Sequence, residues 1–201
     1  MTSRLIVNQI RHTGASADAI TMDASGNVTF PANATCSGTA SGFGGGKLLQ
    51  TIMVHKTDTT SHSAGSTMQD ISGMAVNITP SASTSKILVT SCLNFCTQHG
   101  QYAFALYLLR DSTFLTLGDT SSNRNRATFG GLSDLNNGYD TRPFNLSFLD
   151  SPNTTSQVTY KWQWNNPTHS TPLYLNRSYS DIDGSYGMRV SSNIIVQEIG
   201  A

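Results

Sequence analysis

The sequence predicts an all-β protein, an antiparallel jelly-roll β-sandwich preceded by a short β-rich N-terminal attachment segment. Apolar and polar residues alternate with a period of two over several short stretches, the pattern of half-buried strands. Clusters of Ser, Thr, Asn, Asp and Gly separate these stretches and indicate turns. Since no stretch combines a 3.6-residue apolar period with helix caps, many short strands with polar turns favour a sandwich or jelly roll.

The N-terminal segment, residues 1–37, contains two short β signals. They are LIVNQI at residues 5–10 and AITMDASGNVTF at residues 19–30, which alternates around a turn at Ser25-Gly26-Asn27 and is typical of a small hairpin. So small a piece cannot bury enough apolar area alone, so we expect it to pack against its own copies or another protein. The glycine-rich run GTASGFGGG, residues 38–46, is expected to be a linker.

Residues 47–201 are expected to form the sandwich, and three strands in them are the clearest. Residues 86–95, 143–149 and 157–164 each present one apolar face, formed respectively by Ile87, Val89, Leu93 and Phe95, by Phe144, Leu146 and Phe148, and by Val158, Tyr160, Trp162 and Trp164. Further strands are expected at residues 48–54, 71–78, 113–117, 172–176 and 192–199. The two tryptophans could form a sugar-stacking platform, but four apolar residues at period two favour a place in the core.

The strand at residues 102–109, YAFALYLL, is apolar on both faces. A strand of an antiparallel sandwich normally has one wet face. We therefore expect one face to meet the core and the other a neighbouring subunit, with a trimer interface that includes Tyr102, Phe104, Tyr107 and Leu109. The alternative is that a loop of the same chain covers the second face.

Composition narrows the function classes. The 201 residues include 12 basic and 12 acidic ones, so the formal net charge is zero and only 12% of the residues are charged, about half the usual share. Such a chain gains little from counterion release, which argues against nucleic-acid binding. Without a membrane-spanning apolar run or a signal peptide, we expect a chain made in a cytoplasm, without membrane insertion. Cys36, Cys92 and Cys96 do not suggest a disulfide framework.

No constellation of residues points to catalysis, a metal or another cofactor, so we expect a protein that is not an enzyme. A polysaccharide depolymerase would need two carboxylates across a groove, and the candidates Asp119, Asp134, Asp140 and Asp150 all lie in turn-like contexts. Asp181-x-Asp183-Gly184 lacks the further acidic ligands of a calcium loop and is interpreted as a turn.

Two parts of the chain resemble a known class of proteins. The opening LIVNQI with AITMDASGNVTFP, and the series KILVTS, YAFALYLLRD, LSFLDSPNTTSQVTYKWQW, LNRS and IIVQEI, resemble tail-fibre and other virion-appendage proteins of tailed bacteriophages of the marine or cyanobacterial type. Those proteins carry a trimeric C1q/TNF-like jelly-roll C-terminal domain. The resemblance implies a homotrimer on the virion, attachment to another virion protein through the N-terminal segment, and contact with a host-surface glycan or protein.

The favoured function is therefore a tail-fibre or similar appendage subunit that mediates host attachment. Alternatives are a capsid or tail decoration or connector protein without receptor binding and, less favoured, a polysaccharide depolymerase. Receptor contacts are expected on polar loops at residues 121–126, 136–142 and 165–171. The candidate residues, chosen by composition alone, are Asn123, Arg124, Arg126, Asn137, Tyr139, Asn166 and His169.

Overall fold

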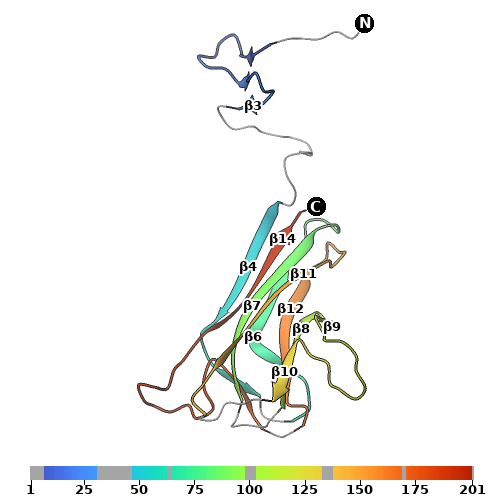
Figure 1. Ribbon diagram of the computed structural model, residues 1–201, viewed down its shortest axis with the longest axis vertical. Coiled ribbons are helices and arrows are strands. Elements are labelled where there is room, and N and C mark those ends of the chain that lie inside the picture. Colours follow the sequence, from blue (N-terminus) through green and yellow to red (C-terminus); the bar gives the residue numbers. More distant parts are fainter. Residues whose placement is uncertain are drawn as a thin grey trace. The chain divides into compact units, whose positions relative to one another are not determined.

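The computed structural model describes residues 7–30, 47–62, 65–97, 103–132, 138–168 and 171–200. The chain divides into two compact units, Met1–Gly45 and Gly46–Ala201 (Figure 1). They are called unit 1 and unit 2 below. The linker expected at residues 38–46 lies outside the described residues.

Unit 1 contains a small antiparallel sheet of three strands, β1 (Gln9–Ile10), β2 (Ile20–Met22) and β3 (Val28–Thr29), in the order β1-β2-β3. The β2–β3 hairpin is closed by the carboxylate of Asp23, which accepts hydrogen bonds from the backbone N–H groups of Ser25 and Asn27, both at 2.9 Å. Gly26 has a φ of 84°, a conformation open to glycine at little cost. The hairpin predicted around Ser25-Gly26-Asn27 is confirmed.

Unit 2 is a sandwich of two antiparallel sheets (Figure 1). The six-stranded sheet has the order β4-β14-β7-β13-β5, with β11 also paired to β7. The five-stranded sheet has the order β10-β8-β12-β6, with β9 also paired to β8. The strands are β4 (Leu48–Lys56), β5 (Thr60–His62), β6 (Gln69–Ile78), β7 (Lys86–Thr97), β8 (Ala103–Arg110), β9 (Thr113–Leu115), β10 (Phe129–Leu132), β11 (Arg142–Asp150), β12 (Val158–Asn165), β13 (Leu173–Leu175) and β14 (Ser192–Ile199).

The pairing of the long strands confirms the predicted jelly roll. The strands β4, β14, β7 and β11 lie side by side in one sheet, and β6, β12, β8 and β10 in the other. Apart from β8 and β10, which pair with each other, successive long strands fall in opposite sheets and pair with strands distant in sequence, the Greek-key arrangement of an eight-stranded jelly roll. The described residues contain no helix.

The core lies between the two sheets and uses the apolar faces that the sequence alternation predicts. Trp162 and Trp164 on β12 are 0% and 1% exposed, so the core interpretation of these tryptophans is confirmed and a sugar-stacking platform is excluded. The indole N–H of Trp162 donates to Ser91 Oγ on β7 at 3.0 Å, which satisfies its only polar group inside the core.

A polar bridge crosses the sandwich at one end. Asp150 on β11 accepts hydrogen bonds from Arg110 on β8 (2.5 Å) and from the hydroxyl of Tyr160 on β12 (2.6 Å). Burial raises the pKa of the Tyr160 phenol, and its hydrogen bond to the Asp150 carboxylate raises that pKa further. The bridge joins the two sheets through a charged and largely buried contact.

Both faces of β8 are covered within the chain, which corrects the expected subunit contact. Phe104 belongs to the main core, while Tyr107 and Leu109 point the other way and are 5% and 3% exposed. The segment that follows β8 covers them, with Leu117 and Ala127 packed against this second face. The alternative of a covering loop is therefore the one that the structure shows, and Phe104, Tyr107 and Leu109 are unavailable to a neighbouring subunit. Tyr102 lies outside the described residues.

The strand register gives unit 2 two distinct ends. Ile199 pairs with both Leu48 and Lys86, so the chain enters unit 2 at the end where β14 finishes; we call this the linker end. The connections β4–β5 and β13–β14 lie at the opposite end, which we call the loop end (Figure 1). The connections at the loop end and the entering chain thus lie at opposite ends of the sandwich.

Candidate functional site

Two of the carboxylates considered for polysaccharide cleavage have structural roles, and a third, Asp140, is exposed. Asp119 accepts a hydrogen bond from the backbone N–H of Thr120 at 2.7 Å, and Asp150 lies in the bridge with Arg110 and Tyr160. Asp134 lies outside the described residues. Within the described ranges, no three His, Cys, Asp or Glu side chains gather in a way that could hold a metal ion, and no helix is long and apolar enough to cross a membrane.

The described cysteines are free thiols. Cys92 is half-buried and Cys96 is fully buried. Burial raises the pKa of the Cys96 thiol to about 11, so the reactive thiolate is scarce at neutral pH. Neither takes part in a disulfide, and Cys36 lies outside the described residues.

A hollow of about 500 Å³ opens on the outer side of the five-stranded sheet, beside its edge strand β10. Its floor consists of small residues from β8 and β10, namely Ala103, Ala105, Gly130 and Gly131. A Cβ on Gly130 would lie 3.0 Å from the carbonyl oxygen of Phe104, closer than such atoms normally pack. Gly131 has a φ of 151°, which also favours glycine. The floor thus lacks large side chains, because close strand approach at Gly130 and backbone conformation at Gly131 both favour glycine.

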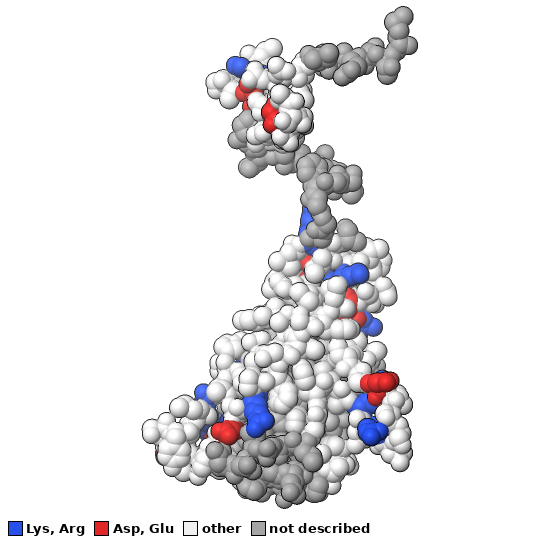
Figure 2. All heavy atoms as spheres, in the orientation of Figure 1, with Lys and Arg blue, Asp and Glu red and all other residues white. Residues whose placement is uncertain are grey.

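The wall of the hollow is the segment between β9 and β10, residues 116–128, which also covers the second face of β8. Gly118, Asp119, Asn125, Arg126, Ala127 and Thr128 of this segment line the hollow. Figure 2 shows charged atoms of both signs over the region where Figure 1 draws this segment. Pro167 and Thr168, which follow β12, close the other side.

The wall segment is held in one conformation by its own hydrogen bonds. Arg126 Nε donates to the carbonyl oxygen of Gly118 at 2.6 Å, and Gly118 N donates to Ala127 O at 3.2 Å. The hydroxyl of Thr128 accepts from Leu108 N on β8 at 3.0 Å and lies 3.0 Å from that of Thr116. Thr116 and Ser122 have φ values of 54° and 48°, which non-glycine residues rarely adopt. Such conformations persist where the surrounding contacts hold the backbone in place.

The structure brings together parts of two of the three predicted receptor loops. Arg126, from the loop at residues 121–126, and Pro167 and Thr168, from the loop at residues 165–171, line the same hollow. Asn123 and Arg124 are exposed on the same wall segment but do not line the hollow. The described residues of the third loop, 138–142, do not line the hollow. Its Tyr139 instead makes an edge-to-face contact with Tyr186, with the ring centroids 5.6 Å apart. Asn137 and His169 lie outside the described residues.

Asn166 is not available to a receptor, which corrects its assignment as a contact residue. Its side chain is fully buried. The amide donates to Thr171 Oγ1 at 2.6 Å, and its oxygen accepts from Thr168 N at 3.3 Å. Asn166 therefore shapes the β12–β13 connection and presents no group to solvent.

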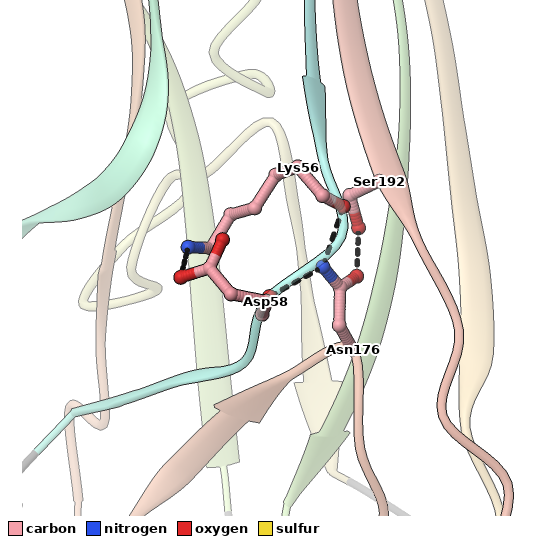
Figure 3. Close-up of polar contacts among 4 residues, drawn as sticks. All are labelled: Lys56, Asp58, Asn176 and Ser192. Atoms are coloured by element: carbon pink, nitrogen blue, oxygen red, sulfur yellow. Dashed lines mark hydrogen bonds and ion pairs between the residues drawn. The ribbon is translucent and has the colours of Figure 1, made fainter.

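A buried amide fixes the longest described loop at the loop end, residues 176–191. The side chain of Asn176 donates to the backbone oxygens of Lys56 and Asp58, both at 2.9 Å, and accepts from the hydroxyl of Ser192 at 2.6 Å (Figure 3). The ammonium of Lys56, itself almost fully buried, pairs with Asp58 at 2.7 Å. Both ends of the loop are thus tied to the β4–β5 connection.

The same loop contains the Asp181-x-Asp183-Gly184 sequence. The two oxygens of Asp181 pair with Arg177 at 3.3 Å and with Arg189 at 2.6 Å, which supports the interpretation as a structural turn. Beyond these ion pairs the loop exposes Tyr186 and Met188, which are 58% and 61% exposed.

The outer face of the six-stranded sheet is free of charged residues over its middle. The register aligns three rows of four residues across β4, β14, β7 and β11, and no row contains Lys, Arg, Asp or Glu. Figure 2 shows charged atoms of unit 2 gathered toward its two ends, with an uncharged middle in that view. Met53 and Leu149 on this face are 56% and 48% exposed. The rows, which we call the neutral face, are Thr51-Gln197-Leu88-Leu149, Met53-Ile195-Thr90-Ser147 and His55-Asn193-Cys92-Asn145.

Comparisons with known proteins give no family for this chain. No protein-family model matches it, and no curated protein matches it significantly. Solved structures with some likeness include the infectious bursal disease virus Gx strain, at 12% identity and a TM-score of 0.32, covering 85% of this chain and 44% of that one. Another is the VP2 subviral particle of the same virus, at 18% identity and a TM-score of 0.30, covering 75% and 39%. The chain spans less than half the length of these two chains, and TM-scores this low support no inference about function.

Proposed function

We propose that the chain is a non-enzymatic structural subunit of a bacteriophage tail fibre or similar virion appendage, and that it assembles as a homotrimer. The observation that carries the assembly is the neutral face. The outer face of a sheet in a monomeric sandwich usually carries polar and charged residues. Here three consecutive rows are uncharged and include the exposed Met53 and Leu149.

A second copy of the chain is the partner that suits this face. A surface without charges has no electrostatic repulsion from its own copies, and the formal net charge of zero keeps long-range repulsion small. Exposed apolar side chains gain free energy when they are buried, at about 25 cal/mol per Å². The neutral face therefore fits a contact between identical subunits better than a contact with a charged ligand.

The size of the neutral face indicates that it is one part of the interface. Three rows across four strands cover about 20 Å by about 19 Å, roughly 400 Å², from ordinary strand spacings. A stable interface takes about 800 Å² from each partner. Further contact is therefore needed, and unit 1 supplies candidates in Ile10, Val28 and Phe30, which are 46%, 51% and 44% exposed.

The place on a virion rests on the resemblance of the opening segment and of the strand series to tail-fibre and appendage proteins. In this proposal unit 1 attaches the subunit to another virion protein, and the loop end of unit 2 faces the host surface. The separation of the linker end from the loop end by the length of the sandwich supports this division of roles. Residues 116–128 and 176–191 are the described surfaces best placed for host contact.

Immunogold labelling of purified virions with an antibody against the loop end tests the location. The proposal expects gold on an appendage and slower host adsorption in the presence of the antibody. Gold spread over the capsid, with unchanged adsorption, would instead support a decoration protein. Purified virions that lack the chain would refute a virion role altogether.

A further inference from the structure

We propose that the hollow beside β10 is a binding site for a neutral saccharide. The inference rests on the recognition part of the proposed function and names its ligand class and its residues. It is independent of the neutral face, since the hollow lies on the opposite sheet. Its volume of about 500 Å³ falls within the range of small-molecule sites.

The wall offers unused hydrogen-bonding groups. The side-chain amide of Asn125 has no hydrogen-bond partner among the described residues, although it lines the hollow. Arg126 uses only Nε, for the carbonyl oxygen of Gly118, and the Asp119 hydrogen bond to Thr120 uses one carboxylate oxygen. One short segment thus presents donors and acceptors together, as hydroxyl groups require because each can both donate and accept.

The charges that line the hollow do not favour a charged ligand. Asp119 and Arg126 line it and have opposite signs, so this lining carries no net charge and gives a polyanion no advantage. An anionic sugar would meet the Asp119 carboxylate as well as the Arg126 guanidinium. A neutral sugar is not repelled by the Asp119 carboxylate, and its hydroxyl groups can form hydrogen bonds with both Asp119 and Arg126.

The floor favours a flat ring over a bulky apolar anchor. Ala103, Gly130 and Gly131 present only a methyl group and backbone, which can contact the C–H face of a pyranose, while Ala105 lies buried beneath them. A protein partner that inserts a large side chain would require a pocket lined by apolar side chains, whereas this floor offers only small residues and backbone. The segment is fixed before binding by the bonds of Arg126 and Thr128, so little ordering entropy is lost.

We expect weak binding by a single site. The described part of the hollow contains no exposed aromatic ring for stacking, since Phe104 is 7% exposed. A dissociation constant of about 1 mM for one site is the expected order, and several linked sites in an oligomer would raise the apparent affinity through effective concentration.

Saturation-transfer difference NMR on the full chain tests the proposal with lactose, maltose and mannobiose as neutral probes and sialyllactose as the anionic comparator. We expect a signal from at least one neutral probe, stronger than that from sialyllactose. Asn125→Ala and Asp119→Ala should each reduce it about fivefold or more. The matched control Asn123→Ala, on the same segment outside the hollow, should leave it within about twofold.

A blocking variant guards against indirect effects. Ala103→Tyr places a large side chain on the floor, and a folded variant, checked by its circular dichroism and melting curve, should lose the signal. The same loss is expected from Thr168→Tyr, at an exposed residue on the other side of the hollow, if the first variant does not fold. No signal from any neutral probe, or a signal that survives both Asn125→Ala and a folded blocking variant, would overturn the proposal. The sugar signal does not depend on the oligomeric mass of the chain. The saccharide proposal can therefore fail while the proposed assembly stands.

Discussion

The side-chain oxygen of Asn176 accepts a hydrogen bond from the hydroxyl of Ser192 at 2.6 Å, which closes the base of the 176–191 loop. The same hydroxyl accepts from Asn94 N on β7 at 2.9 Å. Through Asn176 the network also reaches the backbone oxygens of Lys56 and Asp58 (Figure 3). A single buried amide therefore connects the ends of three strands and sets the position of the loop above them.

Asn176→Ala should lower the free energy of unfolding by about 3 kcal/mol, because it removes three hydrogen bonds, two of them buried, to the Lys56 carbonyl and from the Ser192 hydroxyl. Chemical denaturation measures this directly. Asn176 also has a φ of 64°, so part of the loss would come from backbone strain. Asn153→Ala is the matched control, since Asn153 is exposed with a φ of 53°; it should cost about 1 kcal/mol. Equal losses in the two variants would contradict the role of the network.

Glu198 should titrate far below an ordinary glutamate. Burial alone would raise its pKa, but hydrogen bonds from Ser81 N (2.7 Å), Ser81 Oγ (2.6 Å) and Gln50 Nε2 (2.6 Å) outweigh burial and lower the pKa to about 2. Glu198 is the only glutamate of the chain. A carbon-13 label on the glutamate carboxyl therefore gives one NMR signal, whose midpoint should lie near pH 2 and not near 4.5.

The same shift predicts a loss of stability in acid. Because the folded-state pKa lies below the unfolded-state value, the Glu198 contribution is complete above about pH 4.5 and disappears as the pH falls toward 2. Glu198→Gln should lower the melting temperature at pH 7 and flatten its dependence on pH between 4.5 and 2. An unchanged slope in this window would show that Glu198 is not the group responsible.

The bridge of Asp150 with Arg110 and Tyr160 should contribute more to stability than an exposed ion pair. Asp150→Ala leaves a largely buried guanidinium without its partner, and we expect the free energy of unfolding to fall by about 3 kcal/mol. The control is Asp70→Ala, which breaks the more exposed pair with Lys161 and should cost about 1 kcal/mol or less. If the control proved as costly as Asp150→Ala, the bridge would have no special place in joining the sheets.

A charge on the neutral face should weaken self-association. Met53→Lys places an ammonium in the middle row, beside Ile195, and burying it between subunits would cost several kcal/mol. We expect the oligomer to dissociate at a protein concentration at least tenfold higher than for the unaltered chain, by analytical ultracentrifugation. Thr155→Lys adds the same charge at an exposed turn outside the face and should change nothing. Equal behaviour of the two variants would exclude Met53 from the interface.

Much of the fold could be predicted because one face of each long strand is buried. The alternation over β7, β11, β12 and β14 reports this burial directly, and all four strands form as expected. The sequence gives no such signal for β5, whose residues are Thr60, Ser61 and His62, or for β10, which contains two adjacent glycines. These strands depend on pairing with neighbours that are distant in the sequence.

The candidate site was less predictable, because it depends on what covers each residue. Asparagine in a polar cluster suggests an exposed loop, yet Asn166 uses its amide to satisfy nearby groups and is buried. Tyr107 and Leu109 appeared free because the covering segment begins beyond the strand itself. The neutral face emerges only when the register brings Met53, Ile195 and Thr90 into one row.

The mass of the purified full chain in solution tests the central claim of self-assembly most directly. Analytical ultracentrifugation at micromolar concentration should give a species of three times the 21.6 kDa of one chain. A single species of 21.6 kDa that persists as the concentration is raised would contradict the homotrimer and remove the role proposed for the neutral face.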